Sequence, residues 1–501
     1  MLATSYLDSL FHFDYKYIKH VNNDQTKQNR LVDVTRHDGC KESKGKRKSS
    51  LFNPTIPEPR PHQPHAPIRQ TLIPQTPQDH FGLDPIHTQN QQRIIRRIHF
   101  HRVDLRRVRR RRAGSSEDPR GVPGPVSASR ARNSGGAAAS SWGLGFPVDC
   151  VVYDAFIPWV LDLAKGSGLL AAPFFTQSCA VDCIYHRVYC GELKVPVRGS
   201  EVVVVPGLPP LRPEEMPSFI YVHGSYPSGF KMVTDQFQNI DKADWIFVNT
   251  FYKLEEEVIN CMSRTWKVKA IGPTIPSMYL DKRLHDDKEY GLNIFKTTTD
   301  VCTNWLSKKQ PKSVIYISFG SLAQLSVEQI EELAHALTTL NKHFLWVVRS
   351  SELAKLPKNF SEESSEKGLI VSWCQQLEIL AHDVVGCFVT HCGWNSTLEG
   401  LSLGVPIVAM PQWTDQSTNT KFVVDVWRVG IWARADEKGL VREGEIRRCI
   451  KHVMEGDGEE IRENANKWKE MARDAVDEGG SSDRNIEEFV STLVSSLKGV
   501  N

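Results

Sequence analysis

Residues 373–416 constrain the fold of this chain more than any other stretch. Two short apolar runs, residues 386–390 and residues 406–410, flank a turn that reads His-Cys-Gly-Trp-Asn-Ser. Continuous apolar runs of this length are typical of strands that are buried on both faces of a parallel sheet. A helix is predicted to open at residues 395–396, soon after the first of these strands. The stretch therefore predicts a strand–helix–strand unit of a parallel α/β sheet.

The turn between the two runs has the features of a phosphate-binding site. A helix that begins directly after a parallel strand presents unpaired backbone N–H groups and the positive end of its dipole. Gly393 lets the backbone approach a ligand closely, and Trp373 offers a flat face to a base. Side-chain donors in the turn and acceptors for hydroxyl groups nearby are His391, Asn395, Ser396, Glu399, Asp415 and Gln416. The alternative interpretation is an ordinary strand–helix connection with capping residues.

The composition bounds the remaining possibilities. A chain of 501 residues exceeds a single hydrophobic core, so two or three domains are expected. The eleven Cys residues include no CxxC pair, which argues against a disulfide scaffold or a zinc site and favours a reducing compartment. Charged residues interrupt the N-terminus, and no apolar run approaches the roughly 20 residues that span a bilayer. We therefore expect a cytoplasmic protein without a membrane span.

Residues 1–145 lack the sustained apolar periodicity of a folded domain. Pro and His are dense in residues 54–87, and ten of the twenty residues 93–112 are Arg. This segment is predicted to be largely disordered or irregular, so the first α/β domain is expected to be incomplete. A basic arm is also typical of nucleic-acid binding, but no aromatic interleaving or nucleic-acid fold accompanies the Arg run. Binding to nucleic acid is therefore not expected.

From residue 146 onward, predicted strands alternate with predicted helices, as in parallel α/β sheets. Further strands are predicted at residues 147–153, 169–175, 245–249, 314–318, 344–348 and 369–371. Helices are predicted at residues 179–189, 229–240, 326–340, 442–454, 458–475 and 483–497. Residues 272–297 mix Pro, Gly and charged residues, which indicates a linker between two domains.

The 44 residues from Trp373 to Gln416 resemble, nearly position for position, the signature of plant UDP-sugar-dependent glycosyltransferases that act on small molecules. The resemblance covers residues 146–498 and includes the segments VVYDAFIPW, PFFTQ, GPTIPSMYLD and SFGS. These segments are most similar to the group that glucosylates small carboxylic acids and flavonoids. The implied fold is α/β, with two Rossmann-like domains that face each other in the arrangement called GT-B.

The resemblance also implies the domain boundaries. Residues 146–271 would be the remainder of an N-terminal acceptor-binding domain, and residues 272–297 the linker. Residues 298–480 would form the C-terminal UDP-sugar-binding domain. Residues 481–501 would form a helix that returns to the first domain, and the protein is expected to be a monomer.

The resemblance assigns roles in binding UDP-glucose to residues of the 373–416 stretch and to Ser321 of the SFGS segment. Trp373 would stack on uracil, whose edge would pair with the backbone of Cys374. Gln376 and Glu399 would bind the ribose hydroxyls. The diphosphate is assigned to Ser321, His391, Asn395 and Ser396, and the sugar to Trp394, Asp415 and Gln416. Gly393 belongs to the donor site as the residue that lets the backbone approach the ligand. The terminal Gln suggests glucose over galactose. No metal and no resident cofactor are implied, because the helix dipole and side-chain donors act on the leaving diphosphate.

The family reaction is a single displacement with inversion, in which a His deprotonates the acceptor and an Asp orients that His. Asp154 matches the Asp, although a strand-end carboxylate that caps the following helix is the alternative. Phe174, Phe175 and Gln177 are candidates for the acceptor pocket, and a buried strand end explains the two aromatic residues almost as well.

The general-base His has no match, because the Gly-His-Ile-Asn-Pro-like loop of the family does not occur. His62 and His65 lie at about the right distance from Asp154 but lack the strand–loop context. One hypothesis is that residues 57–140 are read out of frame, since a one-base shift makes three segments in this region family-like. The nucleotide sequence tests it. As written, the chain is expected to be either a UDP-glucose-dependent glucosyltransferase of small plant metabolites or a UDP-sugar-binding remnant that lacks the base.

Overall fold

The computed structural model describes residues 31–33, 149–197, 202–222, 224, 226–284, 287 and 299–498, and all of them belong to one compact unit. Several sequence predictions lie outside these described residues. They are the irregular character of most of residues 1–145, the Arg run, the out-of-frame hypothesis, His62, His65 and the second half of the predicted linker.

The first domain is built on a five-stranded parallel sheet with the order β1-β2-β3-β4-β5. The strands are β1 (Leu31–Asp33), β2 (Cys150–Asp154), β3 (Leu170–Phe175), β4 (Ile246–Val248) and β5 (Val268–Ala270). The helices are α4 (Trp159–Gly166), α5 (Cys179–Tyr189), α6 (Ser218–Tyr221), α7 (Pro227–Asp235) and α8 (Glu256–Met262). Strand β1 comes from the segment expected to be largely irregular, and it extends the sheet beyond β2.

The second domain is built on a six-stranded parallel sheet with the order β11-β10-β9-β6-β7-β8. The strands are β6 (Val314–Ser318), β7 (His343–Val347), β8 (Gly368–Val371), β9 (Val385–Thr390), β10 (Ile407–Ala409) and β11 (Gly430–Trp432). The helices are α9 (Thr299–Leu306), α10 (Val327–Leu340), α11 (Phe360–Glu363), α12 (Gln376–Leu380), α13 (Trp394–Leu403), α14 (Gln416–Lys421), α15 (Glu443–Met454), α16 (Glu459–Val476) and α17 (Ser481–Lys498). The two parallel α/β sheets confirm the predicted fold class.

Several short helical turns complete the described chain. The 3-10 helices are η3 (Pro213–Glu215), η4 (Ile240–Lys242), η5 (Ser277–Tyr279), η6 (Leu353–Lys355) and η8 (Gly456–Gly458), and η7 (Phe422–Val426) is a π-helical turn. Two of the main helices begin at capping serines. The hydroxyl of Ser178 accepts from the backbone of Val181 at the start of α5, and that of Ser326 accepts from Gln329 at the start of α10.

The order of the second sheet determines where a ligand can bind. Strand numbers rise in one direction from β6 to β8 and in the other from β9 to β11, so the topology reverses between β6 and β9. In open α/β sheets, ligands bind beyond the carboxyl ends of the strands at this reversal point. The loops after Ser318 and Thr390 therefore border the expected crevice.

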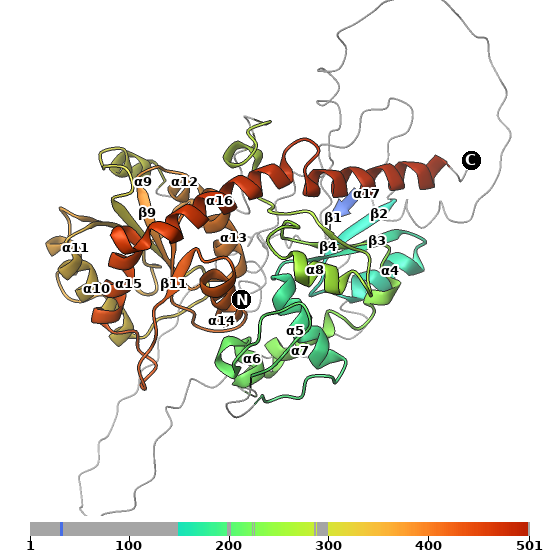
Figure 1. Cartoon of the computed structure of the whole chain (residues 1–501), viewed down its shortest axis with the longest axis horizontal. Coiled ribbons are helices and arrows are strands. Elements are labelled where there is room, and N and C mark those ends of the chain that lie inside the picture. The colour runs from blue at the N-terminus through green and yellow to red at the C-terminus, as the bar shows by residue number, and fades with distance from the viewer. Residues whose placement is uncertain are drawn as a thin grey trace, which may run out of the picture. The chain divides into compact units, whose positions relative to one another are not determined.

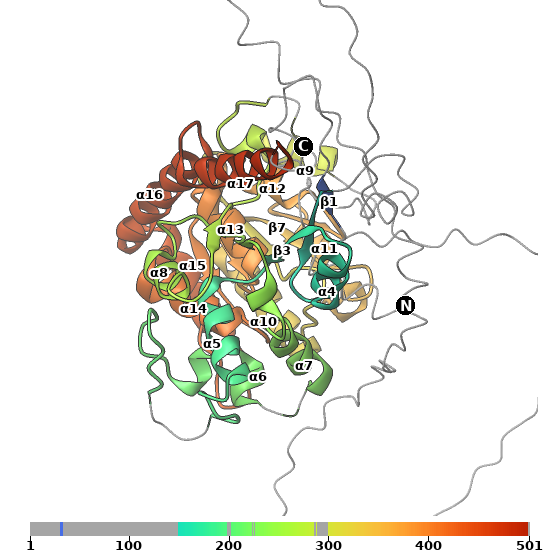
Figure 2. The same cartoon turned by 90° about the vertical axis from the view of Figure 1, so that its right-hand side faces the viewer.

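Helix α17 joins the second half of the chain to the first sheet (Figure 1). Phe489 packs edge-on against Trp245 and Phe247, with ring centroids 5.7 and 4.9 Å away. The side chain of Asn485 donates to the carbonyl of Ala270 in β5 over 2.8 Å. Figure 2 shows α16 and α17 following one another along the same side of the molecule. None of the helices in the described part of the chain has the length and hydropathy needed to cross a membrane.

Candidate functional site

A cavity of about 190 Å³ lies at the carboxyl ends of β6 and β9, where the topology of the second sheet reverses. The twelve residues that the sequence predicts for donor binding all line it. They are Ser321, Trp373, Cys374, Gln376, His391, Gly393, Trp394, Asn395, Ser396, Glu399, Asp415 and Gln416. These positions come from four separate connections of the second domain, and the fold brings them together.

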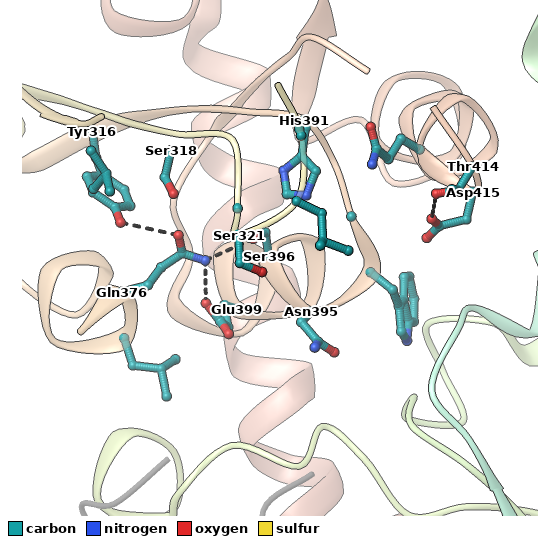
Figure 3. A pocket seen from close by; sticks show the side chains of 18 of the residues that line it. Tyr316, Ser318, Ser321, Gln376, His391, Asn395, Ser396, Glu399, Thr414 and Asp415 are labelled. Carbon is teal, nitrogen blue, oxygen red and sulfur yellow. Dashed lines mark hydrogen bonds between the residues drawn. The ribbon is translucent and has the colours of Figure 1, made fainter. Parts of the chain in front are cut away.

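Gln376, the first residue of α12, connects three elements at one wall of the cavity (Figure 3). Its amide nitrogen donates to the Glu399 carboxylate over 2.6 Å and to the Ser396 hydroxyl over 2.9 Å. The Tyr316 hydroxyl donates to its carbonyl oxygen over 3.2 Å. A side chain with three partners of this kind is held in one orientation before any ligand arrives, which reduces the entropic cost of binding.

His391 occupies a narrow space between two glycines. A Cβ atom added to Gly320 would lie 2.9 Å from the imidazole ring, and one added to Gly393 would lie 2.6 Å from Nε2. Gly320 also has a φ of 71°, a backbone angle that residues other than Gly rarely adopt. Burial lowers the pKa of His391 to about 4, so the ring is neutral at pH 7 and has one N–H available to donate a hydrogen bond without carrying charge.

The N-terminus of α13 faces the cavity directly after β9. Gly393 is the N-cap residue and has no side chain to satisfy the first N–H groups of this ten-residue helix. Asn395 and Ser396 follow in the first turn and line the cavity (Figure 3). The N–H of Trp394, the first of the helix, donates to the Asp415 carboxylate. The next N–H groups of the first turn and the positive end of the helix dipole favour an anion such as a phosphate. This geometry fits the diphosphate site that the turn predicts.

The opposite side of the cavity is formed by the turn before α14. The Thr414 hydroxyl donates to the Asp415 carboxylate over 2.5 Å, and the amide of Asn419 donates to its second oxygen over 2.7 Å. Burial raises the pKa of Asp415, whereas these two hydrogen bonds lower it. The side-chain carbonyl of Gln416 accepts from the backbone N–H of Gln412 and of Trp413, which orients its amide NH₂ group as a donor.

Trp394 lines the cavity, but its indole contacts residues outside it. The indole N–H donates to the carbonyl of Asn249 in the first domain over 2.7 Å, and the ring lies 6.1 Å from that of Trp427. The side chain is 3% exposed and belongs to the hydrophobic core between the two sheets. We therefore expect a contact of Trp394 with a sugar to come from its backbone.

Two of the three candidates for the acceptor pocket lie in the hydrophobic core and not at the cavity. Phe174 and Phe175 are fully buried on opposite faces of β3 and do not line the cavity. Alternate residues of a strand point to opposite faces, and this sheet is covered on both, so the two rings are core residues. Gln177 does line the cavity, beside Thr176, directly after β3.

Asp154 ends β2 and is 2% exposed. One carboxylate oxygen accepts from the backbone N–H of Phe156 over 2.8 Å, which stabilises the turn before α4. This contact corresponds to the capping alternative for Asp154, although the helix itself begins later. Asp154 is absent from the residues that line the described cavity, and a general-base His matching the family pattern is absent from the described residues.

The sequence did not predict several residues that line or support the cavity. Tyr316 lies on β6 in an apolar run that reads as core, and Thr414 has no recognisable signal between Trp413 and Asp415. Arg349 follows β7 and donates to the carbonyls of Ser321 and Ala323, so it fixes the loop that carries Ser321. The Arg349–Glu352 ion pair at 2.9 Å holds the guanidinium in place. Within the described part of the chain, no group of three or more potential metal-binding side chains occurs.

Comparison with known proteins agrees with this geometry. The family model for "UDP-glucoronosyl and UDP-glucosyl transferase" matches residues 292–475. The chain is 52% identical over 351 residues to UDP-glycosyltransferase 74E2 of Arabidopsis thaliana, which covers 69% of this chain and 78% of that protein. It is 49% identical over 351 residues to the flavonol 7-O-beta-glucosyltransferase UGT74F1 of the same plant, covering 69% and 76%. The crystal structure of Os79 from O. sativa in complex with UDP is similar, with a TM-score of 0.66 and 39% identity over 72% of this chain and 81% of that one.

Proposed function

Because the chain belongs to the plant family 1 UDP-glycosyltransferases, we propose that it is a UDP-glucose-dependent glucosyltransferase. The acceptor is a hydroxyl or carboxyl group of a small plant metabolite such as a flavonoid, another phenolic or a carboxylic acid. The transfer inverts the configuration at the anomeric carbon. One observation carries the proposal: all twelve predicted donor residues line one cavity at the reversal point of the second sheet.

The geometry supports a distinct role for each side of the cavity. Trp373 stacks on uracil, and the hydrogen-bonded pair of Gln376 and Glu399 holds the ribose hydroxyls. The diphosphate binds at the N-terminus of α13, beside neutral His391. Asp415 and Gln416 bind glucose hydroxyls from the opposite side, as an acceptor and a donor respectively. We propose that the helix dipole and these donors stabilise the leaving diphosphate without a metal or a resident cofactor.

The chemistry is an in-line displacement. The acceptor oxygen forms a bond to the anomeric carbon as the bond to the diphosphate oxygen breaks, and UDP leaves. The acceptor proton passes to a general base, which is not assigned among the described residues. We propose that Asp154 balances the charge of that base, on the strength of its match to the family segment VVYDAFIPW.

The chemistry of the site and the relatives both support the proposed acceptor class. Thr176 and Gln177 extend the cavity toward the first domain, and Gln177 offers an amide that can bind an acceptor hydroxyl. The similarity to a flavonol 7-O-beta-glucosyltransferase supports a phenolic hydroxyl as one acceptor. A monomeric state and a cytoplasmic location stay predictions.

A transfer assay tests the proposal. The purified full chain is incubated with UDP-glucose and a panel of flavonols, simple phenols and carboxylic acids, and products are identified by mass and by NMR of the anomeric proton. We expect β-glucosides, because inversion converts the α-linked donor to a β-linked product. Asp415→Ala should reduce turnover strongly, whereas Asp425→Ala removes an exposed carboxylate paired with Lys421 and should not.

The result also separates the two candidate functions. An α-linked product would contradict inversion. Protection of the chain by UDP against thermal unfolding, with no product from any acceptor, would favour the UDP-sugar-binding remnant. Loss of the general base alone typically costs about 10²–10⁴-fold in rate, so the assay must detect turnover at that level.

A further inference from the structure

Ser218 of the first domain forms a reciprocal pair of hydrogen bonds with the turn that carries Asp415. The backbone N–H of Ser218 donates to the carbonyl of Thr414 over 2.8 Å. In return, the backbone N–H of Thr414 donates to the Ser218 hydroxyl over 2.7 Å. Ser218 is the first residue of α6, so its N–H has no partner inside that helix and is available for this contact. Both polar backbone groups of Thr414 are therefore satisfied by one residue from the other domain.

The backbone of Thr414 needs such support. Its φ is 55°, in the left-handed region, where the Cβ of a β-branched residue is crowded by its own backbone. Strained residues of this kind persist only where their surroundings determine the conformation, and they concentrate at functional sites. Two hydrogen bonds from a buried serine that is 7% exposed provide that constraint.

The conformation of Thr414 sets the positions of the next two side chains. Its hydroxyl donates to the Asp415 carboxylate over 2.5 Å (Figure 3). The carbonyl oxygen of the Gln416 side chain accepts from the backbone of Trp413 over 3.1 Å. A change of the backbone at Thr414 would therefore move both groups that are proposed to bind the sugar, whereas the base, ribose and diphosphate contacts come from other connections of the sheet.

Neighbouring contacts between the domains do not involve this turn. The hydroxyl of Ser417 donates to the carbonyl of Met216 over 2.6 Å, and that of Thr418 donates to the carbonyl of Glu215 over 2.9 Å. Both side chains lie further along α14, and Ser417 is 6% exposed, which is close to the value for Ser218. These contacts hold the domains together, so they serve as a reference for a purely structural role.

We propose that Ser218 is a positioning residue that determines sugar recognition by holding Thr414 in its left-handed conformation. This inference rests on the proposed function, since it assumes that Asp415 and Gln416 bind the sugar of a nucleotide donor. It predicts that the contribution of the sugar to binding depends on a hydroxyl in the first domain, outside residues 373–416.

The test compares the affinities of the full chain for UDP and for UDP-glucose by titration calorimetry. UDP contains the base, ribose and diphosphate but no sugar, so the ratio of the two dissociation constants reports the sugar contacts alone. Ser218→Ala leaves the Thr414 N–H without its acceptor. We therefore expect the affinity for UDP-glucose to fall about fivefold relative to the affinity for UDP. UDP affinity should stay within about twofold of that of the unmodified chain.

Ser417→Ala is the matched control, because it also removes one buried hydroxyl contact between the domains. We expect it to leave the ratio unchanged, and Ser218→Thr, which keeps the hydroxyl, to restore it. In a Thr414→Gly background the positive φ no longer carries strain, so adding Ser218→Ala should change the ratio by less than about twofold.

Three results would overturn the inference. They are equal losses of UDP and UDP-glucose affinity in Ser218→Ala, equal effects of Ser218→Ala and Ser417→Ala, and an undiminished effect of Ser218→Ala in the Thr414→Gly background. If Ser218→Ala alone fails to fold, a change of more than about twofold in the ratio when Ser218→Ala is added to Thr414→Gly overturns the inference. If the unmodified chain bound neither UDP nor UDP-glucose, the proposed donor itself would be contradicted, and this inference with it.

Discussion

Replacing Gly393 with Ala should weaken UDP binding by displacing His391. The added Cβ would lie 2.6 Å from Nε2 and 3.2 Å from Cε1 of the imidazole ring, whereas ordinary contacts begin at about 3.4 Å. The backbone itself tolerates Ala, because the φ of −58° and ψ of 148° at Gly393 are common for any residue. The clash with the ring is therefore the dominant effect of the substitution.

The size of the effect follows from the confinement of the ring. His391 must move by about an ångström to relieve the clash. The backbone of Gly320 also lies close to the imidazole ring, so it limits the directions in which the ring can move. Overpacking of this kind typically costs about 1–3 kcal/mol in the free energy of unfolding. If the shifted ring loses its hydrogen bond to the diphosphate, UDP affinity falls by about 10- to 100-fold, since such a bond to a charged group contributes about 1.5–3 kcal/mol.

Titration calorimetry with UDP measures this loss, and thermal unfolding shows whether the variant is folded. Gly444→Ala is the matched control, because Gly444 lies in α15 of the same domain and a Cβ there would meet nothing within 4 Å. It should keep UDP affinity. A folded Gly393→Ala variant that binds UDP as tightly as the unmodified chain would refute the assignment of His391 to the diphosphate.

Three further predictions concern other parts of the account. Gln376→Leu removes three hydrogen bonds, one of them to the buried Glu399 carboxylate, so thermal unfolding should show a loss of about 1–3 kcal/mol. The folded-state pKa of His391 lies below the unfolded value of about 6.5, so its contribution to stability is full above that pH and is lost as pH falls toward about 4. Between pH 7 and 5, His391→Gln should therefore lose about 2 kcal/mol less stability than the unmodified chain in denaturant titrations. Phe489→Ala should destabilise the chain by about 3–5 kcal/mol, whereas the neighbouring Glu488→Ala, which removes a partly exposed ion pair with Lys269, should cost under about 1 kcal/mol.

The donor side of the cavity could be predicted because its signals are local. The unit from β9 through α13 to β10 is marked by two apolar runs around a glycine turn, and the structure places these elements within a residue or two of the predicted bounds. Ser326 before α10 is a local signal of the same kind, since a serine with acidic residues in the next turn predicts a helix start. The fold class followed from the alternation of such units.

Elements without a local signal were missed. Strands β5 and β11 have three residues each, as do the predicted β4 and β10, but Lys269 interrupts β5 and β11 opens on Gly430, so neither shows the continuous run of large apolar residues that marked the other two. Helix α14 has the sequence QSTNTK, which reads as a loop, yet most of it is buried because its polar side chains bond to the first domain. The burial that makes this helix stable comes from residues about 200 positions away, so no window of the sequence contains the information.

The acceptor side shows the same limit. Phe174 and Phe175 are the last two residues of β3 and look like pocket residues, but a parallel sheet that is covered on both faces buries both rings. The contact between Ser218 and Thr414 joins residues 196 positions apart and depends on a left-handed backbone at a threonine, which no propensity predicts. Long-range contacts of this kind are where the structure adds most to the sequence.

The most direct test of the donor site is the binding of UDP-glucose to the unmodified full chain. Titration calorimetry should show one site, and UDP should compete for it. UDP-galactose should bind more weakly if, as proposed, Asp415 and Gln416 bind the hydroxyls of glucose. The indole of Trp373 should report the same event as a change in fluorescence, which Trp373→Ala removes. Saturable binding of UDP-glucose that UDP displaces is the predicted result. A folded chain that binds neither nucleotide would contradict the account.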